Sequence, residues 1–266
     1  DDTNLLNFGK SMSFKYKMAM GLIKNATRID LSKSELIQFP PDLFKYKNLQ
    51  KLILRDNRIK VIPKEIINLK RLRMLDLSYN MIEHPFAKLF AINKLETLIL
   101  NNNRIKTLPT QISQLNRLRK LSLSGNNIKK LPKEITKLVN LKSLNISNNP
   151  INEFPFEILE LTQLTTLRIA NINLTTFPAE LIIKELPNLS YLYCYSTHIN
   201  KIKTQETNKD YLFLASFKGN CIQKLKDLVE LSSTHSGPTR SGAEKTETKA
   251  LIHKKKTDNS MPTAKR

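Results

Sequence analysis

The chain has 266 residues, of which 40% are apolar, and a formal net charge of +21 from 44 Lys and Arg against 23 Asp and Glu. This composition suits a folded protein, and no apolar run reaches the roughly 18 residues that mark a membrane-spanning helix, so the sequence predicts no transmembrane segment. Two cysteines, Cys194 and Cys221, argue against a disulfide framework and a zinc site and favour an intracellular protein, either cytoplasmic or, for a secreted bacterial effector, in the host cytosol.

Residues 1–25 are predicted to be an N-terminal cap. Within them, MSFKYKMAMGLIK at 12–24 suits a short amphipathic segment. The open end of a repeat array exposes its core and needs a cover. Capping is therefore the favoured interpretation, and contact with a membrane surface is the alternative.

Residues 26–202 hold eight copies of one pattern. Five stretches begin 23 residues apart: LQKLILRDNRIKVIP (49–63), LRMLDLSYNMIEHPF (72–86), LETLILNNNRIKTLP (95–109), LRKLSLSGNNIKKLP (118–132) and LKSLNISNNPINEFP (141–155). Units that start at Ala26 and Leu164 fit one period before and after, and an eighth starts at Leu189 after a step of 25. A fixed period of this length indicates a solenoid of stacked coils.

Each unit begins with a short predicted strand and a turn. In the pattern LxxLxLxxNxL the central leucines alternate, so they share one face of a strand, and stacked strands make a parallel sheet. The asparagine at the ninth place follows the strand, where its side-chain amide can bond backbone groups of neighbouring coils. We predict a structural ladder, with no catalytic or metal-binding role, formed by Asn57, Asn80, Asn103, Asn126 and Asn149.

The second half of each unit is predicted to be a short helix. Apolar residues three apart follow a proline, such as Pro63 or Pro109, which suits the first helical turn because its missing N–H costs nothing there. Glu65 stands near the positive helix end. In the third unit Pro85 comes one place early, so we expect a local distortion.

With LP, then an E-I-x-x-L helix and a period of 23, the array resembles the intracellular class of leucine-rich repeats, which includes Scribble, Ras-suppressor, Roco-type and bacterial proteins. The resemblance covers residues 26 to about 202. It implies an α/β solenoid, a horseshoe with parallel strands on its concave face and short helices on its convex face. It also implies a protein-binding scaffold, although fold alone does not identify the partner.

Strand side chains that point away from the core would line the concave face, and two areas of it are candidate binding sites. The first mixes basic and apolar types that are enriched at interface centres: Arg55, Arg58, Ile53, Tyr79, Met81, Ile99 and Arg104. The second places Arg168 beside tyrosines, which are common at hot spots: Tyr191, Tyr193 and Tyr195. Alternatively, these side chains pack on neighbouring strands, or the tyrosines pack on a C-terminal cap.

The sequence lacks the patterns of known catalytic and metal sites. It has no phosphate loop, GxSxG elbow, HExxH helix or CxxC pair. The four histidines stand in separate segments, and Cys194 takes an inward place where a buried apolar role is expected. We therefore expect no enzyme, no cofactor and no metal.

Two segments follow the repeats. Residues 203–233 read as two short helices separated at Gly219 and are predicted to cap the solenoid. Residues 234–266 carry eight basic and three acidic side chains and too few apolar ones to fold, so we expect a disordered tail. Its candidate polyanion-binding residues, with a merely solvated tail as the alternative, are Lys254, Lys255, Lys256, Lys265 and Arg266.

Two functions remain open at this point. The leading hypothesis is a scaffold that grips a folded protein in its concave face, and an acidic protein or a small GTPase would suit its charge. The rival is a basic protein attached to RNA or to a ribosome-like ribonucleoprotein particle through its positive surface and its tail. Because no motif for base recognition is present, the rival depends on charge alone.

Overall fold

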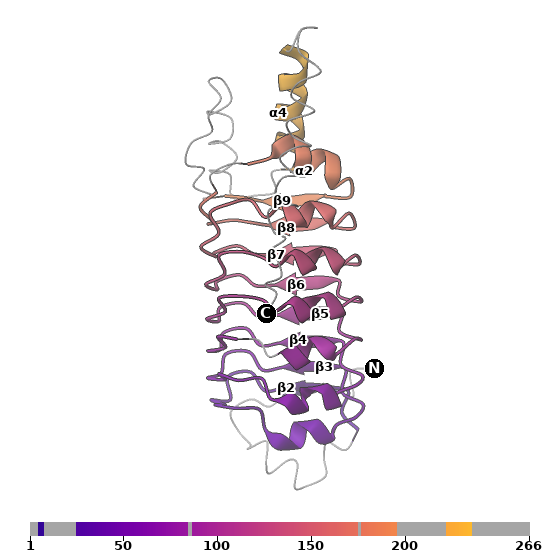
Figure 1. Cartoon of the computed structure of the whole chain (residues 1–266). Helices are drawn as coiled ribbons and strands as arrows, with labels where there is room; N and C mark the ends of the chain where they lie inside the picture. The colour runs from indigo at the N-terminus through magenta and orange to yellow at the C-terminus, as the bar shows by residue number, and fades with distance from the viewer. Residues whose placement is uncertain (1–4, 8–24, 85–86, 175–176, 196–221, 236–266) are drawn as a thin grey trace, which may run out of the picture. The chain divides into compact units, whose positions relative to one another are not determined.

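In the computed structural model, the described residues are 5–7, 25–84, 87–174, 177–195 and 222–235. The chain divides into two compact units, Asp1–Leu225 and Lys226–Arg266. The first unit contains all the strands of the described part, and their pairing makes one parallel sheet (Figure 1). This sheet confirms the predicted α/β solenoid.

The sheet has nine strands among the described residues, paired in chain order. Each is three residues long: β1 (Leu5–Asn7), β2 (Arg28–Asp30), β3 (Lys51–Ile53), β4 (Met74–Asp76), β5 (Thr97–Ile99), β6 (Lys120–Ser122), β7 (Ser143–Asn145), β8 (Thr166–Arg168) and β9 (Tyr191–Tyr193). Paired residues are 23 apart, as in Leu52 and Leu75, except that β8 and β9 pair residues 25 apart, as in Leu167 and Leu192.

A column of apolar side chains sets this register. The middle residue of every strand from β2 to β9 is fully buried: Ile29, Leu52, Leu75, Leu98, Leu121, Leu144, Leu167 and Leu192. A slip of one residue would turn the whole column to solvent. Strands of only three residues can therefore keep one register because the core, rather than strand length, specifies it.

Each coil from β2 to β8 returns through a short helix, and these helices stack in a second column beside the strands (Figure 1). They are η1 (Pro41–Lys45), η2 (Lys64–Asn68), η3 (Ala87–Ala91), η4 (Thr110–Gln114), η5 (Lys133–Lys137), η6 (Phe156–Glu160) and α2 (Ala179–Glu185). The first six are 3-10 helices, whose tighter bonds suit a length of five residues. The predicted convex helices are thus present.

The prolines stand one residue before the helices rather than within the first turn. Pro63 is the N-cap of η2, and its carbonyl accepts the first helical bond from Ile66 N–H at 3.2 Å. Of the seven helices of this column, only α2 has α-helical bonds, such as Ile182 N–H to Pro178 O at 3.0 Å. That coil has 25 residues instead of 23, and its helix is seven residues long. Pro85, where we expected a distortion, lies outside the described residues.

The five ladder asparagines are buried and bond adjacent coils together. Asn103 donates from Nδ2 to the carbonyls of Leu77 at 2.9 Å and Leu100 at 3.1 Å. Its Oδ1 accepts the N–H of Ile82 at 3.0 Å. Equivalent bonds surround the other four: Asn57, Asn80, Asn126 and Asn149. Each amide therefore satisfies backbone groups of its own coil and of the coil before it.

The residue before each ladder asparagine has a left-handed backbone. Most of these places hold Asp, Asn or Gly, which tolerate a positive φ: Asp56 (58°), Asn102 (52°), Gly125 (69°) and Asn148 (55°). Tyr79, with φ of 56°, departs from this preference. The turn after the strand is thus fixed by backbone angle as well as by the ladder.

Replacing Gly125 by alanine is expected to lower the free energy of unfolding by about 1 kcal/mol, because an L side chain is strained at positive φ. The new Cβ would also meet the side chain of Asn102. Urea unfolding followed by circular dichroism measures the loss. Gly125→Asn is the control, since asparagine fills this place at 102 and 148 and should lose less. Equal losses would show that the contact with Asn102, rather than the backbone angle, decides.

The first strand, β1, lies within the segment for which the sequence predicted only a cap. Leu5–Asn7 pairs with Arg28–Asp30 and extends the sheet by one strand. The sequence did contain a sign of this strand, because Leu6 and Phe8 stand one repeat period, 23 residues, before Ile29 and Leu31. The amphipathic segment at 12–24 lies outside the described residues.

At the other end, α4 (Ile222–His235) corresponds to the second of the two helices predicted after the repeats and ends two residues past the expected limit of 233. Ile222 and Leu225 are buried. The first predicted helix and the tail beyond residue 235 lie outside the described residues. In the part of the chain that the structure describes, no helix combines the length and apolar character needed to span a membrane.

Candidate partner-binding face

The concave face is the side of the sheet that points away from the buried column. The first and third residues of each strand face it, and the register aligns them in two rows. One row is Arg28, Lys51, Met74, Thr97, Lys120, Ser143, Thr166 and Tyr191, and the other is Asp30, Ile53, Asp76, Ile99, Ser122, Asn145, Arg168 and Tyr193. The early strands thus present charged and apolar side chains, and the last strand presents aromatic ones.

In the first predicted area, Arg55 stacks on Tyr79. The guanidinium carbon of Arg55 lies 4.7 Å from the centroid of the Tyr79 ring, and both side chains are exposed. Ile53 and Ile99 are half-buried and lie on either side of Asp76 in one row. This part of the face therefore combines a cation–π pair with a neighbouring row in which isoleucines flank an aspartate.

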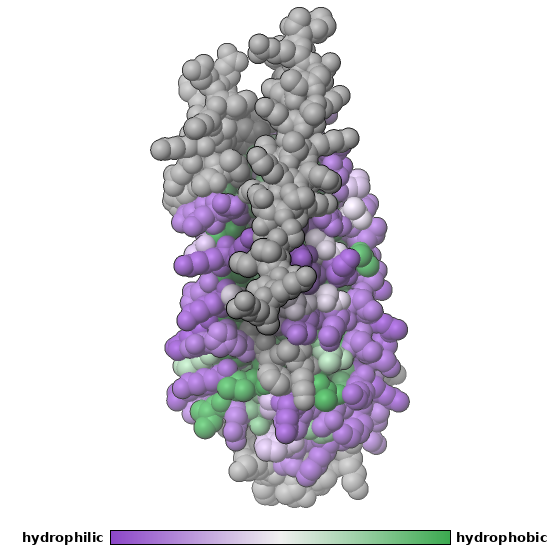
Figure 2. All heavy atoms as spheres, in the orientation of Figure 1, coloured by the Kyte–Doolittle hydropathy of each residue, from purple (hydrophilic) through white to green (hydrophobic). Residues whose placement is uncertain are grey.

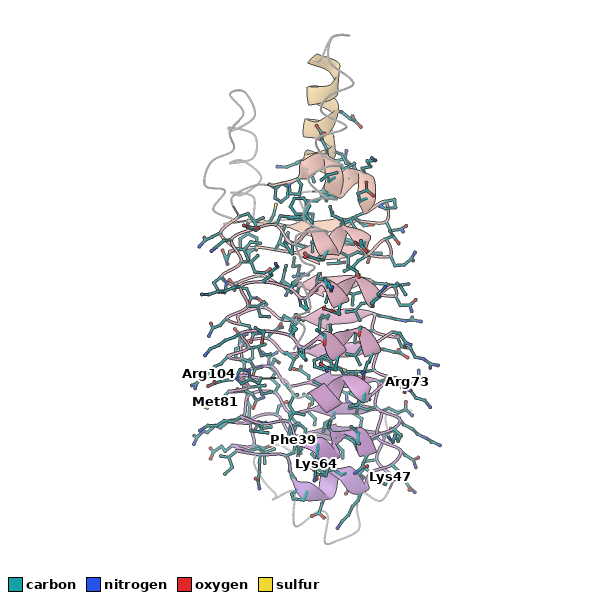
Figure 3. The ribbon with its side chains drawn as sticks, viewed as in Figure 1. Phe39, Lys47, Lys64, Arg73, Met81 and Arg104 are labelled. Carbon is teal, nitrogen blue, oxygen red and sulfur yellow. The ribbon has the colours of Figure 1, made fainter. Side chains whose placement is uncertain are left out.

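Three other members of this area, Arg58, Met81 and Arg104, each follow a ladder asparagine and so stand beyond the strands. Figure 3 labels Met81 and Arg104 on one edge of the solenoid, and Arg73 and Lys47 on the opposite edge. The residues that the sequence grouped together therefore occupy the concave face and its edge.

Two exposed apolar side chains near this edge were not predicted. Ile37 and Val61 are 71% and 68% exposed, and they come three and four residues after the ladder place of their coils. Figure 2 shows hydrophobic side chains grouped at the left, at the level of the early repeats. The sequence signal for Ile37 was its contrast with Lys106 and Lys129 at the same place of later coils, and for Val61 its contrast with Thr107 and Lys130.

In the second predicted area, Arg168 stacks on Tyr193. The two residues are paired across β8 and β9, and the guanidinium carbon lies 4.4 Å from the ring centroid. Tyr191 is 51% exposed beside them, and the carbonyl of Tyr195 accepts the N–H of Asn171 at 3.0 Å. Of the segment expected to cap these tyrosines, 203–233, residues 203–221 lie outside the described residues.

Between the two areas, short polar side chains bond one another. Ser122 Oγ donates to Asn101 Oδ1 at 2.7 Å, and Asn171 Nδ2 donates to Asn148 Oδ1 at 2.7 Å. Asn148 Nδ2 in turn donates to Ser124 Oγ at 3.1 Å. These polar groups already have partners in the protein, so the middle of the face offers few strong contacts.

Two aspartates on the face accept hydrogen bonds from the turn that follows their strand, which the sequence analysis missed. Asp76 Oδ1 accepts the backbone N–H of Ser78 at 2.9 Å and also its hydroxyl, and Asp30 does the same for Ser32. The signal was the repeated Asp-Leu-Ser at 30–32 and 76–78. Carboxylates used in this way stabilise the turn and leave the arginines as the dominant charges of the face.

The edge on which Arg73 and Lys47 lie is strongly basic. Exposed cations occur there and at the equivalent places of later coils: Lys47, Lys70, Arg71, Arg73, Lys94, Arg117, Arg119 and Lys142. Arg73 has an ion pair with Glu96, at 2.9 Å between Nη1 and Oε1. This edge, which was not singled out from the sequence, would attract any polyanion without sequence preference.

The described part of the chain contains no group of three or more His, Cys, Asp or Glu residues placed to hold a metal ion. Cys194 is 2% exposed at the inward place that the alternation of β9 predicts. The candidate polyanion-binding residues of the tail, Lys254 to Lys256, Lys265 and Arg266, lie outside the described residues.

Three family models match the chain. They are a leucine-rich repeat region over residues 110–233 and two leucine-rich repeat models over residues 24–82 and 94–115. A comparison with curated protein sequences found no match. The matched stretches contain most of the strands and ladder asparagines described above.

Solved structures of the same fold come from bacteria and plants. A leucine-rich repeat protein of Leptospira interrogans is 34% identical, with 73% of this chain aligned to 54% of that chain and a TM-score of 0.59. The ectodomain of the Arabidopsis thaliana receptor kinase GASSHO1/SCHENGEN3, in complex with Casparian strip integrity factor 2, is 30% identical over 66% of this chain and 22% of its own, with a TM-score of 0.56. A Listeria monocytogenes internalin is 22% identical over 74% of this chain and 61% of its own, with a TM-score of 0.54, and supports the fold alone.

The chain therefore spans about half the length of the Leptospira protein, 54%. Leucine-rich repeat domains commonly serve as interaction scaffolds and are generally not enzymes. The leucine column, the asparagine ladder and the family matches all agree: the chain is a leucine-rich repeat protein whose coils form one solenoid.

Proposed function

We propose that the protein is a non-enzymatic scaffold that binds a folded protein partner on its concave face. The observation that carries this proposal is the pair of arginine–tyrosine stacks on that face, Arg55 with Tyr79 and Arg168 with Tyr193, in which both arginines are exposed. Arginine and tyrosine dominate interface hot spots because each joins a large contact area to a polar tip. The matched receptor kinase ectodomain was solved with a bound factor, which supports the use of this fold for binding.

The finer features of the proposal follow from charge and sequence pattern. An acidic partner, such as a small GTPase with an acidic surface, suits a face whose net charge is positive. We propose that the repeats are of the intracellular class, that the protein acts inside a cell, and that segments 1–25 and 203–233 cap the solenoid before a basic tail at 234–266. The repeat motif, the near absence of cysteine and the tail composition support these assignments.

The rival proposal, attachment to RNA or to a ribonucleoprotein particle, is favoured by charge alone. The basic edge around Arg73 is exposed, but an array of cations binds any polyanion. The aromatic side chains on this face of the described sheet are Tyr79 and the tyrosines at and after β9, rather than an array along a path for stacked bases.

Affinity purification with the full chain tests the two proposals against each other. Retained proteins are compared before and after RNase treatment, and at about 50 mM and about 200 mM salt. A protein partner that survives both treatments, and that disappears when the concave face is altered, supports the scaffold. Loss of all partners with RNase contradicts it and favours RNA attachment.

Substituting Arg168 and Tyr193 together by alanine is expected to weaken partner binding by about tenfold or more. The free energy of unfolding should fall by no more than about 1 kcal/mol, because Arg168 is exposed and Tyr193 is only half-buried. Lys137→Ala with Val139→Ala is the matched control, since it removes one cation and one exposed apolar side chain outside the concave face. Substantial unfolding of the Arg168/Tyr193 variant would mean that these residues pack the end of the solenoid instead of binding a partner.

A further inference from the structure

Tyr79 occupies a backbone position that does not suit it. Its φ is 56°, and the corresponding residues of the other coils from the second to the seventh are Asp56, Asn102, Gly125, Asn148 and Asn171. Those types tolerate a left-handed backbone, whereas a bulky aromatic residue is strained there. Lys33 of the first coil is the other departure. Strain of this kind clusters at binding sites, so it points to a role for the Tyr79 side chain.

Arg55 departs from its own place in the repeat in the same way. The corresponding residues of most other coils are small and turn-forming: Ser32, Ser78, Asn101, Ser124, Ser147 and Ala170. Ser32 and Ser78 bond the carboxylate two residues earlier, a bond that Arg55 cannot make because Ile53 stands at that place. The second coil therefore has no such bond to a carboxylate and carries an exposed arginine at this place.

The side chains of these two unusual residues contact each other. The Arg55 guanidinium carbon is 4.7 Å from the centroid of the Tyr79 ring, one coil further along. Within the described part of the chain, neither a carboxylate nor a carbonyl accepts a hydrogen bond from this guanidinium. Stacking on the ring restricts the guanidinium, so an acceptor can bind its N–H groups with little further loss of side-chain entropy.

We infer that the Arg55–Tyr79 stack is a preorganised receptor for a carboxylate of the protein partner. A guanidinium held in one plane matches the two oxygens of Asp or Glu. The tyrosine contributes orientation and contact area at the cost of a strained backbone. This inference rests on the proposed function and specifies it: the partner presents an acidic side chain to this point of the concave face.

The distance between the two stacks sets the length that a partner segment needs to contact both. Arg168 lies over Tyr193 in the same order, arginine first and tyrosine one coil later. Arg55 follows β3 and Arg168 belongs to β8, so the two arginines are five strand spacings apart, or about 24 Å. The short polar side chains between them are bonded to one another. An acidic segment of about ten residues, if extended, is long enough to reach both stacks.

The test measures fluorescence anisotropy of a labelled oligo-glutamate peptide of about ten residues with the full chain and its variants. Tyr79→Asn is expected to weaken binding about fivefold or more and also to raise Tm by about 1–3 °C, because asparagine relieves the backbone strain. Tyr79→Phe keeps the ring and should change neither quantity. Arg55→Lys keeps the charge but loses the planar guanidinium and its paired N–H donors, and should weaken binding about fivefold.

Lys70→Ala is the matched control, since Lys70 is an exposed cation at the repeat place of Lys47, on the opposite edge. Its loss should change binding less than about twofold. Equal weakening in Lys70→Ala and Arg55→Lys would overturn the inference in favour of diffuse charge, as would tighter binding of an oligo-uridine of similar length. Tyr79→Asn with unchanged binding would also overturn it. The scaffold proposal would survive these results if RNase-resistant partners still depended on the concave face.

Discussion

Replacing Asn103 by alanine is expected to lower the free energy of unfolding by about 2–4 kcal/mol. The change leaves the Ile82 N–H without its acceptor and the Leu77 and Leu100 carbonyls without their donor. All these groups lie in the interior of the solenoid, where water cannot replace the lost bonds without opening the coil. Urea unfolding of the full chain measures the loss.

The matched control for this prediction is Asn127→Ala. Asn127 is exposed, and within the described residues only its backbone N–H is bonded, to the Ile105 carbonyl at 2.8 Å. Its substitution should change the free energy of unfolding by no more than about 0.5 kcal/mol. If Asn103→Ala cost as little, the ladder would not be a source of stability, and the leucine column alone would have to hold the coils together.

Replacing Phe90 by alanine is expected to cost about 3–5 kcal/mol. Phe90 is the largest of the fully buried side chains in the described part of the chain. It belongs to η3, between the helices of the neighbouring coils, and its removal would leave a cavity that the stacked coils cannot close without losing their register. The measurement is again chemical unfolding, with thermal unfolding as a second readout.

Phe44→Ala provides the comparison because Phe44 stands at the same place in η1, two coils earlier, and is only half-buried. We expect it to cost at most about half as much, in proportion to the apolar area that it buries. Similar losses in the two variants would show that burial at this place does not determine stability. A small loss for Phe90→Ala would show that the third coil repacks around the gap.

Much of the fold could be predicted because its causes are local and repeated. Alternating leucines at a fixed period determine which residues share a buried column, and the ninth-place asparagine of five coils ends each strand in the same turn. The pattern also showed which residues precede a helix, although Pro63 proved to stand one place before it. The strand at Leu5–Asn7 was missed because the rest of its coil has no ladder asparagine and no proline.

The candidate site was less predictable, because it depends on contacts between coils. The list of outward residues contained Arg55, Tyr79, Arg168 and Tyr193, but composition could not show that they form two stacks. Nor could it show that Asp76 is engaged by Ser78 or that Ile37 is exposed, because these outcomes follow from the path of each turn. The most informative residues were those that break the pattern of their column, which alignment of the coils reveals without a structure.

The asparagine ladder has a direction. Asn57 serves the backbone of the first coil, Asn80 that of the second and Asn103 that of the third, always one coil back. Where Ile172 replaces the asparagine, the preceding coil bonds itself instead, from Ile151 N–H to Asn149 O at 2.8 Å. Since a chain emerges from the ribosome with its N-terminus first, each early coil becomes complete only when the next has been synthesised. Until the sixth coil is made, the growing protein therefore ends in a coil that still lacks its asparagine bond. The sixth coil needs no asparagine from its successor, because Ile151 N–H bonds within its own coil.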